Sequence, residues 1–175
     1  MSYVALDTMI MIWGLRGGGN AEQRDMERRA RVLLNQLDED KASVIIPSVA
    51  VAELLVPIDE ADHATFLSEL QRRFICPPFD LRAASIAAQL WRSHRQLPKS
   101  DQVKRTTLKA DVLIVATARA AGAARFYSHD KKTRRLAALV GIEGFDLPTH
   151  DENMFREQEA REASRGAKHG RKAKR

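Results

Sequence analysis

Cysteine is nearly absent from this chain, and long hydrophobic runs and phosphate-binding glycine motifs are absent altogether. One cysteine, Cys76, occurs among 175 residues, which excludes an intramolecular disulfide framework and a cysteine-rich zinc site. No run approaches the roughly 18 consecutive apolar residues of a membrane-spanning helix, so we do not expect an integral membrane protein. The glycines at 17–19 lack the GxxxxGK[ST] pattern of a nucleotide-binding loop.

The N-terminal segment lacks the features of a secretory signal. It has no Lys or Arg before its apolar part, and it carries Asp7 within that part. With so little cysteine, this favours a cytoplasmic protein. Hydrophobic residues make up 44% of the chain and charged residues 30%, a mixture typical of one globular domain rather than a disordered or fibrous chain.

The positive charge is concentrated at the C-terminal end. The formal net charge is +6, yet six basic residues and no acid lie within residues 165–175. Residues 1–164 therefore contain 23 basic and 23 acidic residues and are neutral overall. A basic tail suits a polyanion such as nucleic acid, and it equally suits a solvated end. We divide the chain into a domain over 1–150 and a charged helix with a basic, disordered tail over 151–175.

Short β-type runs alternate with amphipathic helical patterns along the first 150 residues. Strands are predicted at 3–6, 43–46, 74–76, 125–128 and 144–147, and helices at 8–14, 21–37, 48–55, 60–73, 81–96, 110–121 and 131–140. Ser48 and Asp80 are candidate helix caps, and the polar segment 97–109 is predicted to be a loop. This alternation predicts an α/β fold, a three-layer α/β/α sandwich around a central parallel sheet.

Four acidic residues occupy positions that such a sheet would bring together. Asp7 ends the first strand and Asp130 closely follows the 125–128 strand, so both lie at the carboxyl edge. Glu53 stands about a turn and a half into the helix after the second strand. Asp111 is expected in the first turn of the helix after the 97–109 loop. Because functional crevices lie beyond the carboxyl ends of parallel strands, we expect the four carboxylates to converge there.

Apolar flanks around three of these acids predict a metal site. Asp7 lies in YVALDTMIMI, Glu53 in SVAVAELLV and Asp111 in ADVLIVATA. A lone carboxylate in such surroundings is costly to ionise and has a raised pKa, and four together repel one another. A divalent cation removes both problems. Carboxylate oxygens suit Mg²⁺ or Mn²⁺, and zinc is disfavoured because no His or Cys is interleaved.

Each acid also has an ordinary structural interpretation. Asp7 can cap a helix, and Asp130 can be a turn residue. Asp111 can complement a helix dipole from the first turn. Glu53 is the hardest to explain in this way, because the residues around it are apolar.

Four short segments resemble the PIN-domain nucleases, and most closely the VapC-type bacterial ribonuclease toxins. They are LDT at 6–8, SVAVAEL at 48–54, ADVLIVATA at 110–118 and FYSHD at 126–130, and the resemblance extends from residue 3 to about 148. By position, Asp7, Glu53, Asp111 and Asp130 match the acidic cluster of the family. Ser128 matches its small hydroxyl residue. Thr8 is expected to contact the carboxylates and hold them in place without binding the metal itself.

The resemblance implies a set of functional expectations. It implies an α/β/α sandwich, dependence on Mg²⁺ or Mn²⁺, cleavage of single-stranded RNA, frequent homodimers and, for toxins, a cognate antitoxin. The metal would be held by the four acids, and it would activate water for attack on a phosphodiester. An acidic site repels RNA, so flanking cations are needed. The candidates, which can equally belong to solvated surface, are Lys104, Arg105, Lys109, Lys131, Lys132, Arg134 and Arg135.

Two other functions fit parts of the pattern. A phosphatase of the haloacid-dehalogenase class also begins with Asp at the end of a first strand. Its D-x-D-x-T pattern requires a second Asp where this chain has Met9, however, and it gives Glu53 no role. A non-catalytic RNA- or protein-binding module with vestigial acids is the second alternative. The main hypothesis is a metal-dependent endoribonuclease acting on single-stranded RNA, as the toxin of a toxin–antitoxin pair.

Overall fold

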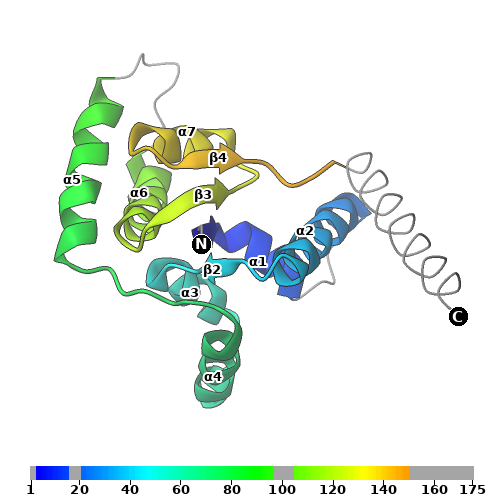
Figure 1. Cartoon of the computed structure of the whole chain (residues 1–175). Coiled ribbons are helices and arrows are strands. Elements are labelled where there is room, and N and C mark those ends of the chain that lie inside the picture. The colour runs from blue at the N-terminus through cyan, green and yellow to red at the C-terminus, as the bar shows by residue number, and fades with distance from the viewer. Residues whose placement is uncertain (1–2, 16–20, 97–104, 150–175) are drawn as a thin grey trace, which may run out of the picture.

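Four short parallel strands form the centre of the molecule, which a computed structural model describes over residues 3–15, 21–96 and 105–149 (Figure 1). Along the sheet, β2 (Ser43–Ile45) is followed by β1 (Tyr3–Leu6), β3 (Ala123–Tyr127) and β4 (Glu143–Phe145). All the strand pairings are parallel, with Val4 opposite Val44 on one side and Arg125 on the other. The carboxyl ends of the four strands therefore share one edge of the sheet.

Helices connect the strands and cover the sheet. They are α1 (Thr8–Leu15), α2 (Ala21–Glu39), α3 (Ser48–Leu55), the 3₁₀ turn η1 (Glu60–Asp62), α4 (His63–Arg73), α5 (Leu81–Arg95), α6 (Arg105–Ala120) and α7 (Lys131–Leu139). Figure 1 shows α5, α6 and α7 grouped on one side of the molecule, and α1 packed against α2 on another. The predicted α/β/α sandwich with a parallel sheet is confirmed. No helix in the described ranges is long and apolar enough to cross a bilayer.

The core lies between the sheet and its helices. Val4, Ala5 and Leu6 of β1 are fully buried, as is Phe126 of β3. Buried residues lie on most sides of α6 between residues 112 and 118, as expected for a helix enclosed by its neighbours. Burying one large apolar side chain contributes roughly 1.5–3 kcal/mol, so these residues fix the position of α6 against the sheet. They also fix the place of its one acidic residue, Asp111.

The start of α6 differs from the sequence prediction. The segment 97–109 was predicted to be a loop, but the helix begins at Arg105. Asp111 is consequently the seventh residue of α6, about two turns in, and not part of the first turn. This weakens the alternative interpretation of Asp111 as a partner of the helix dipole, because that effect fades beyond the first turn.

Two smaller predictions around α3 are also corrected. The predicted strand at 74–76 is a single bridge, in which Ile75 pairs with Ile45, and prolines follow it at once. Ser48 does not cap α3, because its hydroxyl accepts a hydrogen bond from the Phe79 amide. The predicted cap at Asp80 is confirmed by its bond from the Ala83 amide, 2.8 Å. The glycines at 17–19 and the predicted helix and tail over 151–175 fall outside the described residues.

Candidate active site

Asp7 and Ser128 meet at the carboxyl edge of the sheet because β1 and β3 are neighbours in register. The Asp7 amide donates to the Tyr127 carbonyl at 3.0 Å, which continues the strand pairing by one residue. The Ser128 hydroxyl then donates to Asp7 Oδ2 at 2.6 Å, and the Thr8 amide donates to Oδ1 at 2.7 Å. Both carboxylate oxygens of a buried side chain are thus held in place.

Thr8 connects this carboxylate to the helix α3. Its buried hydroxyl donates to Glu53 Oε2, across 45 residues of chain. Glu53 itself is exposed, so the expectation of an apolar setting for it is wrong. The reason is the helical period, since Val51 and Leu54 face the core while Ala52 and Glu53 face outward.

Asp111 reaches the same region from α6. Burial, together with the negative charges of Asp7, Asp130 and Glu53, raises its pKa from 3.8 to about 7, and burial is the largest cause. A hydrogen bond with the Thr133 side chain opposes this change. Asp111 Oδ2 is buried and has no hydrogen-bond partner. Since carboxylates affect one another's pKa only at short range, the four acids lie within electrostatic reach of each other.

Asp7 is the most enclosed of the four acids. Burial raises its pKa, and the charges of Glu53 and Asp130 raise it further. The hydrogen bonds from Ser128 and Thr8 favour the ionised form and act in the opposite direction. Asp7 also directly precedes α1, so its interpretation as a residue at a helix start is compatible with its place in the cluster.

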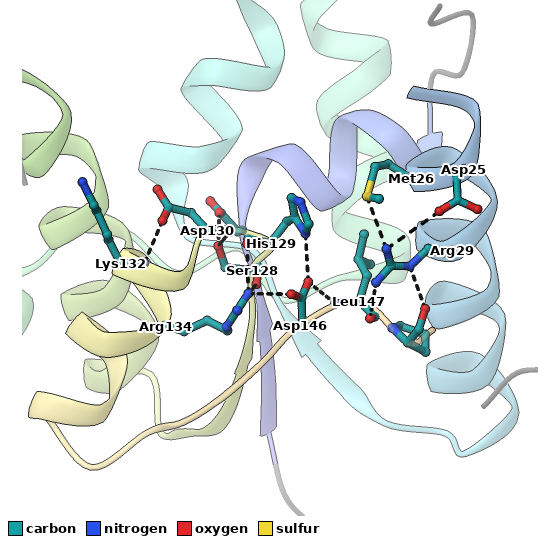
Figure 2. A network of polar contacts seen from close by, with 12 residues as sticks. Asp25, Met26, Arg29, Ser128, His129, Asp130, Lys132, Arg134, Asp146 and Leu147 are labelled. Carbon is teal, nitrogen blue, oxygen red and sulfur yellow. Dashed lines mark hydrogen bonds and ion pairs between the residues drawn. The ribbon is translucent and has the colours of Figure 1, made fainter. Parts of the chain in front are cut away.

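Asp130 combines a structural role with a place at the site. Its Oδ1 accepts a hydrogen bond from the Lys132 amide at 2.7 Å, which caps α7, and its side chain is exposed. Its own amide donates to the Ser128 hydroxyl at 3.1 Å, as Figure 2 shows. One hydroxyl group, on Ser128, therefore links Asp130 to Asp7.

The donor set at this edge suits a hard cation. It consists of carboxylates backed by hydroxyl groups, and the partnerless Asp111 Oδ2 is an atom that a cation would satisfy. Within the described part of the chain, no three carboxylate, imidazole or thiol groups converge closely enough to form a ready-made metal site. Like-charged carboxylates repel one another, which opposes such a convergence. Two of the four, Glu53 and Asp130, are exposed and have room to rotate.

The basic residues predicted to contact RNA are placed differently from one another. Lys131 and Lys132 are exposed at the start of α7, and Lys109 is exposed on α6. Lys104 and the side chain of Arg105 lie outside the described residues. Arg134 has its guanidinium bound to protein groups. It donates to the carbonyls of residues 128 and 129 and pairs with Asp146.

Three residues near the acids were not singled out by the sequence. Asp146 follows β4 and so lies at the same sheet edge as Asp7, but the predicted strand 144–147 placed it inside the strand, because β4 ends two residues earlier than predicted. Thr133, in the first turn of α7, forms a hydrogen bond with Asp111 of α6, which no spacing in the sequence indicates. The Trp13 ring stands edge-on to His129, with 5.8 Å between the ring centroids.

Comparison with known protein families gives one match over most of the chain. A family model described as "PIN domain" matches residues 4–139. No curated protein is significantly similar to the chain.

Solved structures of similar fold include chains of bacterial VapBC complexes. VapBC2 from Rickettsia felis, bound to a DNA fragment from its promoter, superposes with a TM-score of 0.59 at 15% identity over 83% of this chain and 99% of that one. DNA-bound VapBC from Salmonella typhimurium gives a TM-score of 0.58 at 15% identity over 85% of this chain and 100% of that one. VapBC-1 from nontypeable Haemophilus influenzae gives a TM-score of 0.58 at 13% identity over 83% of this chain and 98% of that one. At such identities the similarity shows a shared fold.

Proposed function

The chain belongs to the PIN-domain family, and from this premise we propose that it is a metal-dependent nuclease that hydrolyses phosphodiester bonds of single-stranded RNA. The observation that carries the proposal is the mutual influence of the four carboxylates at one sheet edge. Hydrogen bonds through Ser128 and Thr8 join Asp7, Asp130 and Glu53, which come from three segments of the chain, and the charges of these three acids raise the pKa of Asp111. A cluster of this kind favours bound divalent cations and the chemistry that they support.

The residues have distinct roles in this proposal. Asp7, Glu53 and Asp111 would hold Mg²⁺ or Mn²⁺, with Asp130 completing the set. Such an ion, when bound, activates water for attack and offsets negative charge on the phosphodiester. Ser128 and the Thr8 amide fix the two oxygens of Asp7, while the Thr8 hydroxyl holds Glu53 toward the same edge. No side chain is required as a general base.

A cleavage assay with metal removal tests this function. The purified protein is expected to cut a labelled single-stranded RNA in the presence of Mn²⁺ or Mg²⁺, to stop when EDTA is added, and to resume when excess metal is restored. DNA of the same sequence serves as the comparison substrate. Release of phosphate from small phosphomonoesters without RNA cleavage would instead favour a phosphatase. RNA binding without cleavage, and without Mn²⁺ binding by calorimetry, would favour a non-catalytic module.

We propose that exposed lysines beside the acids contact the RNA phosphates. Lys131 and Lys132 directly follow Asp130, and Lys109 belongs to the same helix as Asp111. Lys104 and Arg105 remain predicted contacts. In a catalytically inactive background, changing Lys131 and Lys132 to alanine is expected to reduce the slope of log binding constant against log salt by about 1.4, since each phosphate contact on a single strand contributes about 0.7. Filter binding across a salt series measures the slope.

A matched control for this measurement lies on α2. Arg24 and Arg31 are also exposed and basic, but Figure 1 places their helix on another side of the molecule from α7. Changing both to alanine removes the same charge and is expected to leave the slope unchanged. An equal reduction in both double variants would show that only overall charge matters.

We further propose that the protein acts in the cytoplasm as the toxin of a toxin–antitoxin pair and forms a homodimer. The support is the shared fold with chains of three VapBC complexes. Expression of the chain is expected to arrest bacterial growth, and the arrest is expected to vanish in the Asp7→Asn variant and on co-expression of a small DNA-binding protein encoded beside it. Growth at the uninduced rate, with the protein present and folded, would contradict the toxin proposal.

A further inference from the structure

We propose that Arg134 is a positioning residue of the acidic site, which it reaches by fixing the turn of residues 128–130 and, through that turn, the carboxylate of Asp7. The proposal rests on the nuclease function argued above. It gives a new role to a residue whose sequence context indicated only a solvated cation or an RNA contact.

The guanidinium of Arg134 holds the backbone of this turn directly. Its Nη1 donates to the Ser128 carbonyl at 2.6 Å and to the His129 carbonyl at 2.9 Å. The same nitrogen lies 3.1 Å from Asp146 Oδ2, which follows β4. Figure 2 shows Arg134 between the turn and Asp146. Four-fifths of the Arg134 side chain is buried, with 20% exposed, so these contacts compete little with water.

Other contacts hold both partners of the ion pair, the Asp146 carboxylate and the part of α7 that carries Arg134. Asp146 Oδ1 accepts a hydrogen bond from the Leu147 amide at 2.7 Å and lies 3.0 Å from His129 Nδ1. On the helix side, a methyl group at Gly144 would lie 3.0 Å from the Arg134 carbonyl oxygen, so β4 and α7 are in close contact there. A residue larger than glycine would push the helix away from the strand. The backbone of Arg134 and the carboxylate of Asp146 are therefore both held in place.

Ser128 connects the turn held by Arg134 to the side chain of Asp7 and the amide of Asp130. Its amide donates to the Phe145 carbonyl, and its carbonyl accepts from Arg134, so the backbone on both sides of its side chain is held. Its hydroxyl donates to Asp7 and accepts from the Asp130 amide. Without Arg134, two carbonyls of the turn lose a charged donor, and the hydroxyl is free to leave Asp7. Second-layer contacts of this kind typically change metal affinity by about 10–100-fold.

Arg29 provides a matched control in the same region. Its Nε and Nη2 donate to the carbonyls of Pro148 and Leu147 at 2.8 and 2.7 Å, and its Nη1 lies 3.8 Å from Asp25. Its side chain is 14% exposed, close to the value for Arg134. Like Arg134, it ties two backbone carbonyls near the end of β4 and faces a carboxylate, as Figure 2 shows, but these contacts do not include the turn at 128–130.

Amide hydrogen exchange in the full-length protein tests the positioning role without using activity. In Arg134→Gln, exchange at the amides of Thr8 and Asp130 is expected to accelerate about tenfold or more, because their acceptors become mobile. In Arg29→Gln these two amides are expected to exchange at the wild-type rate, although both variants lose similar thermal stability. Unchanged rates in Arg134→Gln, or equal acceleration in the two variants, would overturn the proposal. If Arg134→Gln does not fold, Arg134→Lys is used, with a smaller change in the same direction.

Mn²⁺ binding and RNA cleavage then connect the turn to the proposed function. Calorimetry is expected to show at least about tenfold weaker Mn²⁺ binding for Arg134→Gln and wild-type binding for Arg29→Gln. Cleavage by Arg134→Gln is expected to fall in kcat, with KM for RNA unchanged. A rise in KM with kcat unchanged would mean that Arg134 contacts RNA and would overturn the proposal. A wild-type protein that neither binds Mn²⁺ nor cuts RNA would refute the nuclease function, and the exchange rates would still decide the positioning role.

Discussion

Asparagine in place of Asp7 is expected to lower the rate of metal-dependent RNA cleavage by about 100-fold or more. Asp7 lies at the centre of the proposed site, because it is linked to Ser128 by a hydrogen bond and to Glu53 through the neighbouring Thr8. The substitution removes a negative charge while it keeps the shape of the side chain. Weaker Mn²⁺ binding, measured by calorimetry, is expected to accompany the loss of cleavage.

The fold is expected to survive this substitution. An asparagine can turn its oxygen toward the Thr8 amide and its amino group toward the Ser128 hydroxyl, so the neighbours of Asp7 keep hydrogen-bond partners. It also removes a buried charge whose ionisation the fold disfavours. Asp40→Asn is a suitable control, because Asp40 is an exposed acid just after α2. Wild-type cleavage by Asp7→Asn, in protein with a normal melting curve, would show that the site is assigned wrongly.

Much of the arrangement could be predicted because it follows from strand order. A residue at or just beyond the end of a parallel strand lies at the carboxyl edge, and this places Asp7, directly after β1, and Asp130, three residues after the end of β3. The alternation of elements is equally clear in the sequence, since each strand is a short apolar run closed by a polar residue or proline. These predictions depend on local patterns and on general rules of connection.

Other features depend on contacts that the sequence pattern does not encode. The exposure of Glu53 depends on which side of α3 meets the core, and its apolar neighbours on both sides conceal that choice. The polar start of α6 carries no helical periodicity, and a helix there is stabilised by the buried residues that follow. The role of Arg134 requires the positions of a turn, a helix and a strand end together. Its neighbour in sequence, Arg135, is equally basic, but it is exposed whereas Arg134 is mostly buried.

Asp111→Asn is expected to abolish RNA cleavage and, at the same time, to stabilise the metal-free protein at pH 8. Burial and three neighbouring carboxylates raise the pKa of Asp111 to about 7, so at pH 8 the folded protein contains a disfavoured charge. Asparagine removes that charge and can still accept the hydrogen bond from Thr133. The full pKa difference corresponds to roughly 4 kcal/mol, and solvent screening at this partly exposed side chain reduces the expected gain to about 2 kcal/mol. In EDTA this is a rise in Tm of about 4–8 °C.

The pH dependence has a definite sign. Below pH 3.8 the carboxyl group is protonated in both the unfolded and the folded chain, and it contributes nothing to the difference. Between pH 3.8 and about 7 the folded protein keeps the proton that the unfolded chain releases, so the free energy of unfolding falls as the pH rises. Above about pH 7 the carboxyl group is ionised in both states, and it lowers the free energy of unfolding no further. The advantage of Asp111→Asn is therefore expected to be small near pH 4 and largest above pH 7, whereas Asp7, whose pKa is also raised, keeps some slope in the variant.

Glu53→Gln separates burial from simple charge repulsion in this experiment. It removes one negative charge from the same cluster, but Glu53 is exposed, so the gain in Tm is expected to be much smaller than for Asp111→Asn. Added Mn²⁺ is expected to raise the Tm of the wild type and to leave that of Asp111→Asn nearly unchanged, because a cation stabilises only the protein that binds it. An Asp111→Asn variant that is no more stable than the wild type at pH 8 would mean that Asp111 is not held against its ionisation. Asp111 would then give the acid cluster no electrostatic need for a cation.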